Sequence, residues 1–239
     1  MEIILTPHSE IYNQAIYSYN DYIYKQSIQR NQMWEPEIIE NMIKFYPENT
    51  DVIDVGANIG LISLGFLKNL TKSLGSLRCF ECDTSTYCLL EQNFQIHPKV
   101  NLYPFALSDG QKLCQISSNR YNLGCNYIYQ SKDPNLLQQY EYSFIPKTNI
   151  KLDKSWILSV SLDSISYHFT NRIGLIKIDV EGFEYFVLVG AKKMIERDHP
   201  VIIVEIWEIN IEKVKTFLIN EMGYTSCNNI GNENYIFVF

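Results

Sequence analysis

With 239 residues, 46% of them hydrophobic and 20% charged, the chain can bury one large core without disulfides or a structural metal. A net charge of -7, with no run of Lys and Arg longer than the pair at 192–193, makes nucleic acid an unlikely partner. The first residues lack a basic segment followed by an apolar stretch, and no apolar run approaches the roughly 20 residues of a membrane helix. We therefore expect a cytoplasmic protein with no signal peptide and no membrane partner.

The N-terminal 34 residues are rich in Tyr and Asn and mix strand-like with weakly helical pieces. We expect residues 1–34 to form a flap or short hairpin, and we place the main domain at residues 35–239. Its first element is a helix over 35–45, where apolar residues recur at helical spacing and Pro36 fits the first turn.

From residue 51 onward, apolar strand-like runs alternate with amphipathic segments. The predicted strands are 51–55, 76–82, 100–107, 175–180 and 200–207. The predicted helices open at Asn58 or Ile59 and continue to 70, and then cover 84–96, 185–196 and 211–222. Continuous apolar strands separated by helices are typical of a parallel sheet covered on both faces.

Two segments depart from this alternation. Residues 111–160 are polar and aromatic, and we interpret them as an insertion of antiparallel strands and loops over the carboxyl edge of the sheet. Residues 224–239 read as two antiparallel strands joined by a turn at 231–234. The predicted fold class is therefore α/β and Rossmann-like, with a mostly parallel sheet and a β-rich insertion.

The stretch DVIDVGANIG, residues 51–60, carries the first chemical signal. A strand that ends in glycine and runs into a helix is typical of nucleotide-binding turns, but the spacing from Gly56 to Gly60 is not that of a dinucleotide loop. This favours a nucleoside-linked amino acid, whose ammonium Asp54 could hold. Glu81 ends the second strand roughly twenty residues later, where a carboxylate can accept both hydroxyls of a ribose. The alternative is a structural turn with a surface glutamate.

The six cysteines are irregularly spaced, as expected for reduced thiols. Cys79 and Cys82 form a C-x-x-C pair, but on a strand their side chains would point to opposite faces. Without a second pair at metal spacing, burial is favoured over a zinc site.

Several motifs together resemble the class I S-adenosylmethionine-dependent methyltransferases, and specifically the FkbM family. They occur in the family's order and span about residues 33 to 210: DVGANIG (54–60), FE (80–81), FALSD (105–109), SLDSI (161–165), IKIDVEGFE (176–184), VLVGA (187–191) and VIIVE (201–205). The chain departs from the family at Cys82, where members usually carry proline. The N-terminal segment and the insertion match no part of the family that we can assign.

The resemblance implies S-adenosylmethionine as the cofactor and a sheet of seven strands with an antiparallel last strand. The first loop would cradle the methionine part, Glu81 would hold the ribose, and the turn at 105–107 would line the adenine. The implied cofactor-binding residues are Asp54, Gly56, Ala57, Asn58, Gly60, Glu81, Cys82, Phe105, Ala106 and Leu107.

The candidate catalytic residues lie in IKIDVEGFE. Lys177 and Asp179 are two apart on a strand and face the same side, and Glu181 lies in the loop beyond. Methyl transfer to a hydroxyl benefits from a base for the departing proton. Our hypothesis makes Asp179 or Glu181 the base or the acceptor-orienting group, assisted by Lys177 or Glu205. Glu184 is expected only to cap the following helix, since acids are favoured in a first turn.

Hard oxygen ligands from Asp179, Glu181 and Glu205 could also gather a divalent metal, although nothing in their spacing demands one and we do not expect it. The family's usual acceptors favour a hydroxyl of a carbohydrate or small metabolite. Asn122, Gly124 and nearby tyrosines of the insertion are candidates for the acceptor side.

Three rival functions remain. A 2′-O-methyltransferase acting on RNA would use a Lys-Asp-Lys-Glu set that Lys177 and Asp179 partly match, but the acidic charge counts against it. A module could bind the cofactor without catalysis. A nicotinamide oxidoreductase is disfavoured by the glycine spacing and by the lack of a hydride-relay residue.

Overall fold

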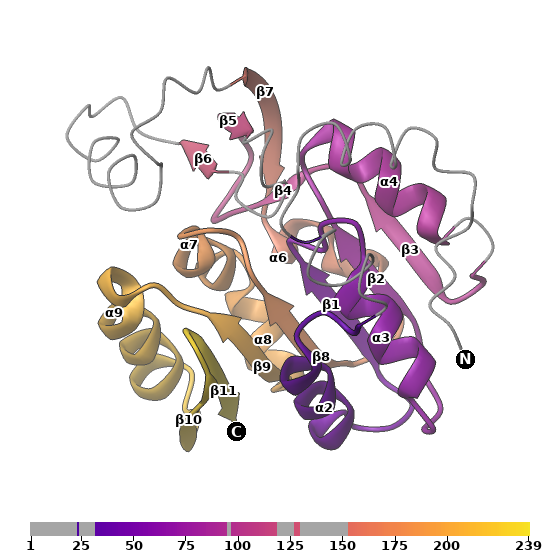
Figure 1. The fold of residues 1–239 in the computed structure, drawn as a ribbon. Coiled ribbons are helices and arrows are strands. Elements are labelled where there is room, and N and C mark those ends of the chain that lie inside the picture. The colour runs from indigo at the N-terminus through magenta and orange to yellow at the C-terminus, as the bar shows by residue number, and fades with distance from the viewer. Residues whose placement is uncertain (1–22, 24–31, 95–96, 119–126, 130–152) are drawn as a thin grey trace.

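The computed structural model describes residue 23 and residues 32–94, 97–118, 127–129 and 153–239 (Figure 1). Nearly all of the expected N-terminal flap, residues 1–34, lies outside this described part. The acceptor-side candidates Asn122 and Gly124 lie outside it as well.

A seven-stranded sheet forms the centre of the molecule (Figure 1). Its strands, in spatial order, are β10 (Ser226–Gly231), β11 (Asn234–Val238), β9 (Val201–Glu205), β8 (Ile173–Ile178), β1 (Asp51–Val55), β2 (Leu77–Phe80) and β3 (Val100–Tyr103). β11 runs antiparallel to both of its neighbours, and the other pairings are parallel. This confirms the predicted mostly parallel sheet with an antiparallel last strand.

Helices cover both faces of this sheet (Figure 1). One face carries α2 (Pro36–Phe45), α3 (Leu61–Asn69) and α4 (Thr84–Phe94). The other carries α6 (Leu162–Ile165), α7 (Glu184–Val189), α8 (Lys192–Asp198), α9 (Ile211–Lys215) and the π-helical η4 (Thr216–Glu221), while the short 3₁₀ segments are η2 (Ser166–His168) and η3 (Glu208–Asn210). Among the described residues, none of these helices combines the length and the apolar character that a membrane crossing needs.

The alternation of side chains along the strands separates two hydrophobic clusters. On β1, Val52 packs with α2, α3 and α4, whereas Ile53 packs with α7 and α8. By the same alternation, Asp54 faces the side of Val52, and Lys177 and Glu205 of the next two strands face that side too. The sheet therefore brings these three polar side chains to one face.

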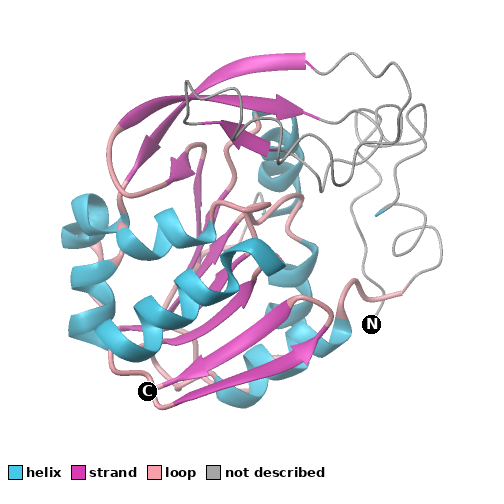
Figure 2. Ribbon diagram, turned by 90° about the vertical axis from the view of Figure 1, so that its left-hand side faces the viewer, coloured by secondary structure: helices cyan, strands magenta, loops and turns pink. Residues whose placement is uncertain are grey.

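The insertion contributes a second, four-stranded sheet in the order β4, β7, β5, β6. Its strands are β4 (Ala106–Leu107), β5 (Lys112–Ser118), β6 (Tyr127–Tyr129) and β7 (Asp153–Val160). β5 is antiparallel to β6 and β7, which confirms antiparallel strands between the third and fourth main strands. Because β4 begins just after β3 ends, this sheet lies beyond the carboxyl end of the main one (Figure 2).

Three predicted elements are wrong in their extent. The strand predicted at 100–107 ends at Tyr103, because Pro104 has no N–H for the ladder, and Ala106 pairs with β7 instead. The helix predicted at 185–196 breaks at Gly190, where a Cβ would lie 1.9 Å from the Ser108 carbonyl oxygen. The helix predicted to open at Asn58 or Ile59 is α3, which begins only at Leu61, because Gly60 before it is in a left-handed conformation with φ 88°.

A buried ion pair fixes the opposite, amino-terminal edge of the sheet. Asp51 is fully buried, and its Oδ2 accepts hydrogen bonds from Arg78 Nη2 at 2.7 Å and Arg78 Nε at 3.2 Å. Its Oδ1 accepts hydrogen bonds from the backbone N–H of Ser76 and the Asn171 amide, at 2.7 and 3.0 Å. All four bonding positions of this carboxylate are thus engaged far from the carboxyl edge.

We expect Asp51→Asn to destabilise the fold by about 3–5 kcal/mol, because it leaves the Arg78 guanidinium buried without a counter-charge. Thermal unfolding should show a melting temperature lower by roughly 10 °C. Glu221→Gln, which removes the exposed ion pair to Lys192, is the control and should change stability by less than about 1 kcal/mol. Equal melting temperatures for Asp51→Asn and the control would contradict this assignment.

Candidate active site

The loop after β1 contains three residues in the left-handed region: Gly56 (φ 75°), Asn58 (φ 52°) and Gly60 (φ 88°). A Cβ on Gly56 would lie 1.7 Å from the carbonyl oxygen of Asp179, and one on Gly60 would lie 2.5 Å from the Phe94 ring. Contacts within the protein therefore explain both glycines: Gly56 allows the close approach of the chain after β8, and Gly60 allows the start of α3 to pack on α4. The left-handed turn also delays the start of α3.

Glu81 connects this loop to the end of β2. One carboxyl oxygen accepts the Asn58 N–H at 3.0 Å, and the other accepts the Asp83 N–H at 2.8 Å. The backbone N–H groups of Gly56 and Ala57 both bond the Phe80 carbonyl, each at 3.0 Å. Glu81 is buried, so it is not the surface glutamate of the alternative interpretation, and burial raises its pKa to about 7.

Lys177 is the cation at the centre of the carboxyl edge. Its Nζ lies 3.2 Å from Asp179 Oδ2, 3.5 Å from Asp54 Oδ1 and 3.5 Å from the Gly56 carbonyl. Burial alone would lower the pKa of this buried ammonium, but Asp179 and Asp54 raise it above its ordinary value. Lys177 is therefore permanently charged, which suits it to hold carboxylates and not to accept a proton.

Asp54 is already engaged inside the protein. Its Oδ2 accepts a hydrogen bond from the Ser63 hydroxyl at 2.6 Å, and the ammonium nearest its Oδ1 is that of Lys177. Among the described residues, Oδ1 has no hydrogen-bond partner at a bonding distance. A direct bond from Asp54 to a cofactor ammonium stays a prediction.

Asp179 and Glu205 form a pair that shares one proton. Burial would raise the pKa of Asp179, but Lys177 and a hydrogen bond from Glu205 lower it below its ordinary value. Conversely, the charge of Asp179, followed by burial, raises the pKa of Glu205. Asp179 is thus the ionised partner at neutral pH and Glu205 the protonated one.

Glu35 is a site residue that the sequence did not reveal. It immediately precedes α2, in a left-handed conformation with φ 44°. Burial and the nearby Asp179 raise its pKa, while Lys177 lowers it, so its carboxyl group faces the same cluster. In the sequence, Glu35 carried only the signal of a helix start next to Pro36.

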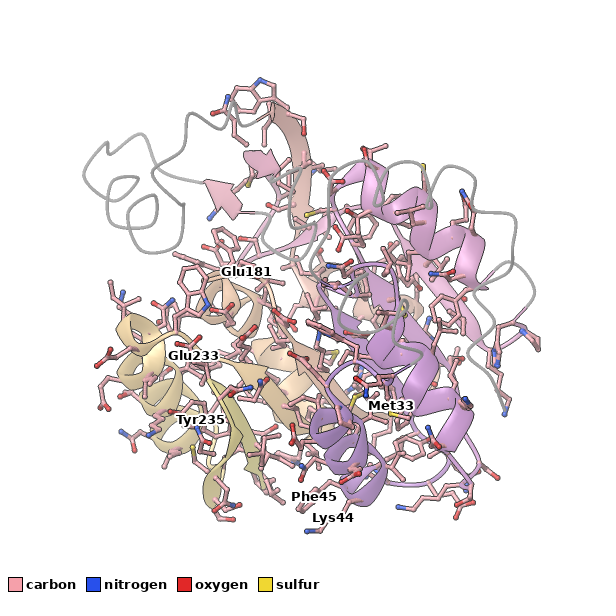
Figure 3. The ribbon with its side chains drawn as sticks, viewed as in Figure 1. Met33, Lys44, Phe45, Glu181, Glu233 and Tyr235 are labelled. Carbon is pink, nitrogen blue, oxygen red and sulfur yellow. The ribbon has the colours of Figure 1, made fainter. Side chains whose placement is uncertain are left out.

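Glu181 lies in a tight turn beyond β8 (Figure 3). It has φ 55° and the following Gly182 has φ 99°, while the Phe183 N–H bonds the Val180 carbonyl at 3.3 Å. Two central residues of positive φ are the pattern of a type I′ turn, in which glutamate is unusual. Burial, followed by the charges of Asp179 and of other acids, raises the pKa of Glu181 to about 9.

The residues predicted to surround the adenine lie where β2 and β3 end. The half-buried Phe105 ring packs edge-on against Phe80, with ring centres 5.7 Å apart. The Ala106 and Leu107 side chains are buried in two hydrophobic clusters, and Cys82 packs beside Ala106. Ala106 and Leu107 could therefore meet a ligand through their backbone only, and the adenine contact stays a prediction.

The donor set fits S-adenosylmethionine. The carboxyl groups of Asp54 and Asp179 lie within 3.5 Å of the Lys177 ammonium, and Glu35 is close enough for its charge to raise the pKa of Lys177; such an acidic surplus suits a ligand with a sulfonium and an ammonium group. Within the described part of the chain, no three His, Cys, Asp or Glu side chains are arranged to hold a metal ion.

Comparison with known proteins gives one family. The family model of the methyltransferase FkbM domain matches residues 54–226. A search of curated proteins gave no match.

Among solved structures, the methyltransferase FkbM from Methylobacillus flagellatus KT superimposes with a TM-score of 0.54 and 12% identity, covering 80% of this chain and 44% of that one. The present chain therefore spans less than half of that protein's length. Aeropyrum pernix fibrillarin, solved with natively bound S-adenosyl-L-methionine, has a TM-score of 0.46 and 9% identity, covering 93% of this chain and 76% of that one. At sequence identities this low, the comparison with these two structures shows a similar fold and nothing about function.

Because the folded state holds protons on the buried carboxyls of Glu181, Glu184 and Glu205 that the unfolded chain releases near their ordinary pKa, the stability that these groups contribute is greatest at low pH and is lost as the pH rises. Burial raises the pKa of Glu184 to about 7 and that of Glu181 to about 9, and the charge of Asp179 raises that of Glu205 to about 11, so the loss should run from about pH 5 to about pH 11. Glu205→Gln should make this slope shallower by up to about 1.4 kcal/mol per pH unit.

Urea unfolding at a series of pH values measures this slope, with Glu221→Gln as an exposed control that should match the wild type. Wild-type stability that rises with pH through this window, or an unchanged slope in Glu205→Gln, would show that the cluster does not hold the proton.

Proposed function

Since the chain belongs to the FkbM methyltransferase family, we propose that it transfers the methyl group of S-adenosylmethionine to a hydroxyl of a carbohydrate or small metabolite. The observation that carries this proposal is the ionised carboxylate of Asp179. It lies at the carboxyl end of β8, next to the glycine loop, with Lys177 as its counter-ion. Open α/β sheets bind their ligands at this edge.

The cofactor would lie across the ends of β1 and β2. Glu81 would accept the ribose hydroxyls, the loop from Gly56 to Gly60 would border the methionine part, and Phe105 would contact the adenine. When bound, S-adenosylmethionine supplies an electrophilic methyl group on a cationic sulfur. The surplus of carboxyl groups around Lys177 favours binding of such a cation, which supports this placement.

Asp179 would orient the acceptor. Lys177 and Glu205 both donate to its carboxylate, so the group is fixed in direction and ionised before the acceptor arrives. It would accept a hydrogen bond from the acceptor hydroxyl and take the proton of that hydroxyl, whose oxygen receives the methyl group while the electron pair of the broken methyl–sulfur bond stays on the sulfur. Glu181, protonated at neutral pH, can donate to a second oxygen of the acceptor.

A 2′-O-methyltransferase acting on RNA is the alternative, because the Lys177–Asp179 ion pair matches part of the set that such enzymes use. The net charge of -7 weighs against it, since an acidic chain repels a phosphate backbone. A chain that binds the cofactor without transferring its methyl group is the other alternative.

Calorimetry should show binding of S-adenosylmethionine, weakened about 10-fold or more in Glu81→Gln because an amide NH2 replaces one of the two oxygens that we propose accept the ribose hydroxyls. Glu91→Gln, the same change at an exposed position of α4, is the matched control and should bind as the wild type does. Binding of NAD with no binding of S-adenosylmethionine would end the proposal.

Asp179→Asn keeps the shape of the side chain, and Glu205, whose pKa the charge of Asp179 raises, can ionise in its place, so the dissociation constant of S-adenosylmethionine should stay within a few-fold of the wild type. Methyl transfer should fall by about 100-fold or more, because the oriented base is lost. The measurement is tritiated-methyl transfer to glycans, nucleosides and capped RNA. A fully active Asp179→Asn would overturn the assignment, and transfer to capped RNA alone would favour the RNA alternative.

A further inference from the structure

One glycine beside the site, Gly182, is held through both of the peptide groups that flank it. The N–H of Gly182 donates to Glu184 Oε1 at 2.8 Å, and its carbonyl accepts from Asn210 Nδ2 at 3.1 Å. Glu184 comes from the first turn of α7, whereas Asn210 ends η3, which follows β9. Both side chains are buried, with 1% and 4% exposure. Two separate elements therefore converge on a single residue of the turn.

What these bonds hold is an unfavourable backbone conformation. Glu181 is left-handed, which costs a residue with a side chain about 1–2 kcal/mol, and such strain persists only where the surroundings over-determine it. The turn's own hydrogen bond, from Phe183 to Val180, is long at 3.3 Å. The bonds to Glu184 and Asn210 thus supply much of the restraint that keeps the Glu181 carboxyl where it is.

The simpler interpretation, that Glu184 merely caps α7, does not account for its surroundings. Its carboxyl group bonds its own N–H at the start of the helix, but it also reaches back to Gly182, which precedes the N-cap residue Phe183 and lies outside the helix. Its second oxygen is buried and has no hydrogen-bond partner among the described residues. Burying a half-satisfied carboxyl is costly, and a surface cap would avoid that cost.

We propose that Glu184 and Asn210 are positioning residues that clamp the two peptide groups on either side of Gly182, and that this clamp sets the direction of Glu181 toward the acceptor. The inference rests on the proposed methyl transfer. It adds to that proposal two side chains that touch neither cofactor nor acceptor and act through the turn.

The test uses the full chain and four variants. Glu184→Leu and Asn210→Leu remove one bond each while keeping a similar volume, and Glu184→Gln is the conservative rescue because its amide oxygen can still accept the Gly182 N–H. Glu221→Gln is the exposed control. Three quantities are measured: hydrogen exchange of the Gly182 amide by NMR, the dissociation constant of S-adenosylmethionine, and release of S-adenosylhomocysteine in the presence of mixed methyl glycosides.

In Glu184→Leu, the Gly182 amide should exchange about 10-fold faster or more, since it loses its only side-chain acceptor among the described residues. In both leucine variants, kcat should fall by about 10- to 100-fold while S-adenosylmethionine affinity stays within about 3-fold. Glu184→Gln should remain within about 3-fold of the wild type in all three quantities.

Unchanged amide exchange in Glu184→Leu would show that there is no clamp. Faster exchange with an unchanged kcat would show that the clamp is purely structural, which would also overturn the proposal. Failure of the methyl-transfer proposal itself would look different, because the wild type would then release no S-adenosylhomocysteine although its Gly182 amide is protected.

Discussion

The ammonium group of Lys177, buried between the carboxylates of Asp54 and Asp179, is the interaction on which both the sheet and the site depend. Asp54 and Lys177 are direct neighbours in the parallel pairing of β1 with β8, at the centre of the seven strands. Either charge alone would be costly to bury there, whereas together they tolerate burial because each neutralises the other. The constraint that stabilises the middle of the sheet thus also fixes Asp179 at its carboxyl edge.

The positions of the protons follow from this arrangement. Since Lys177 keeps Asp179 ionised, the neighbouring Glu205 holds its proton, and Glu181 and Glu35 also have raised pKa values. The site is therefore acidic in composition but carries less negative charge than its residues suggest. A cationic ligand would lower the pKa values of these carboxyl groups and so increase the negative charge of the site.

Much of the sheet could be predicted from the sequence, because the alternation of apolar strands and helices is a local signal. The parity of residues on a strand likewise placed Lys177 and Asp179 on one side. The strand predicted through Pro104 was too long, because the prediction followed the run of apolar residues and did not take into account that proline has no N–H to pair with the next strand. The two glycines of the first loop were interpreted in terms of a ligand, whereas the structure gives them contacts with Asp179 and Phe94. Contacts of this kind join segments distant in the sequence and leave no local pattern.

The same limit explains the site residues that the sequence did not reveal. Glu35 reaches the cluster only because α2 packs beside β9, and Asn210 reaches Gly182 across 28 positions of the chain.

The most direct test of the placement of the cofactor is a crystal structure of the full chain with S-adenosylhomocysteine. The expected result is a ribose on Glu81, with the sulfur directed toward Asp179. A ligand bound away from the ends of β1 and β2, or a ribose that does not touch Glu81, would contradict it.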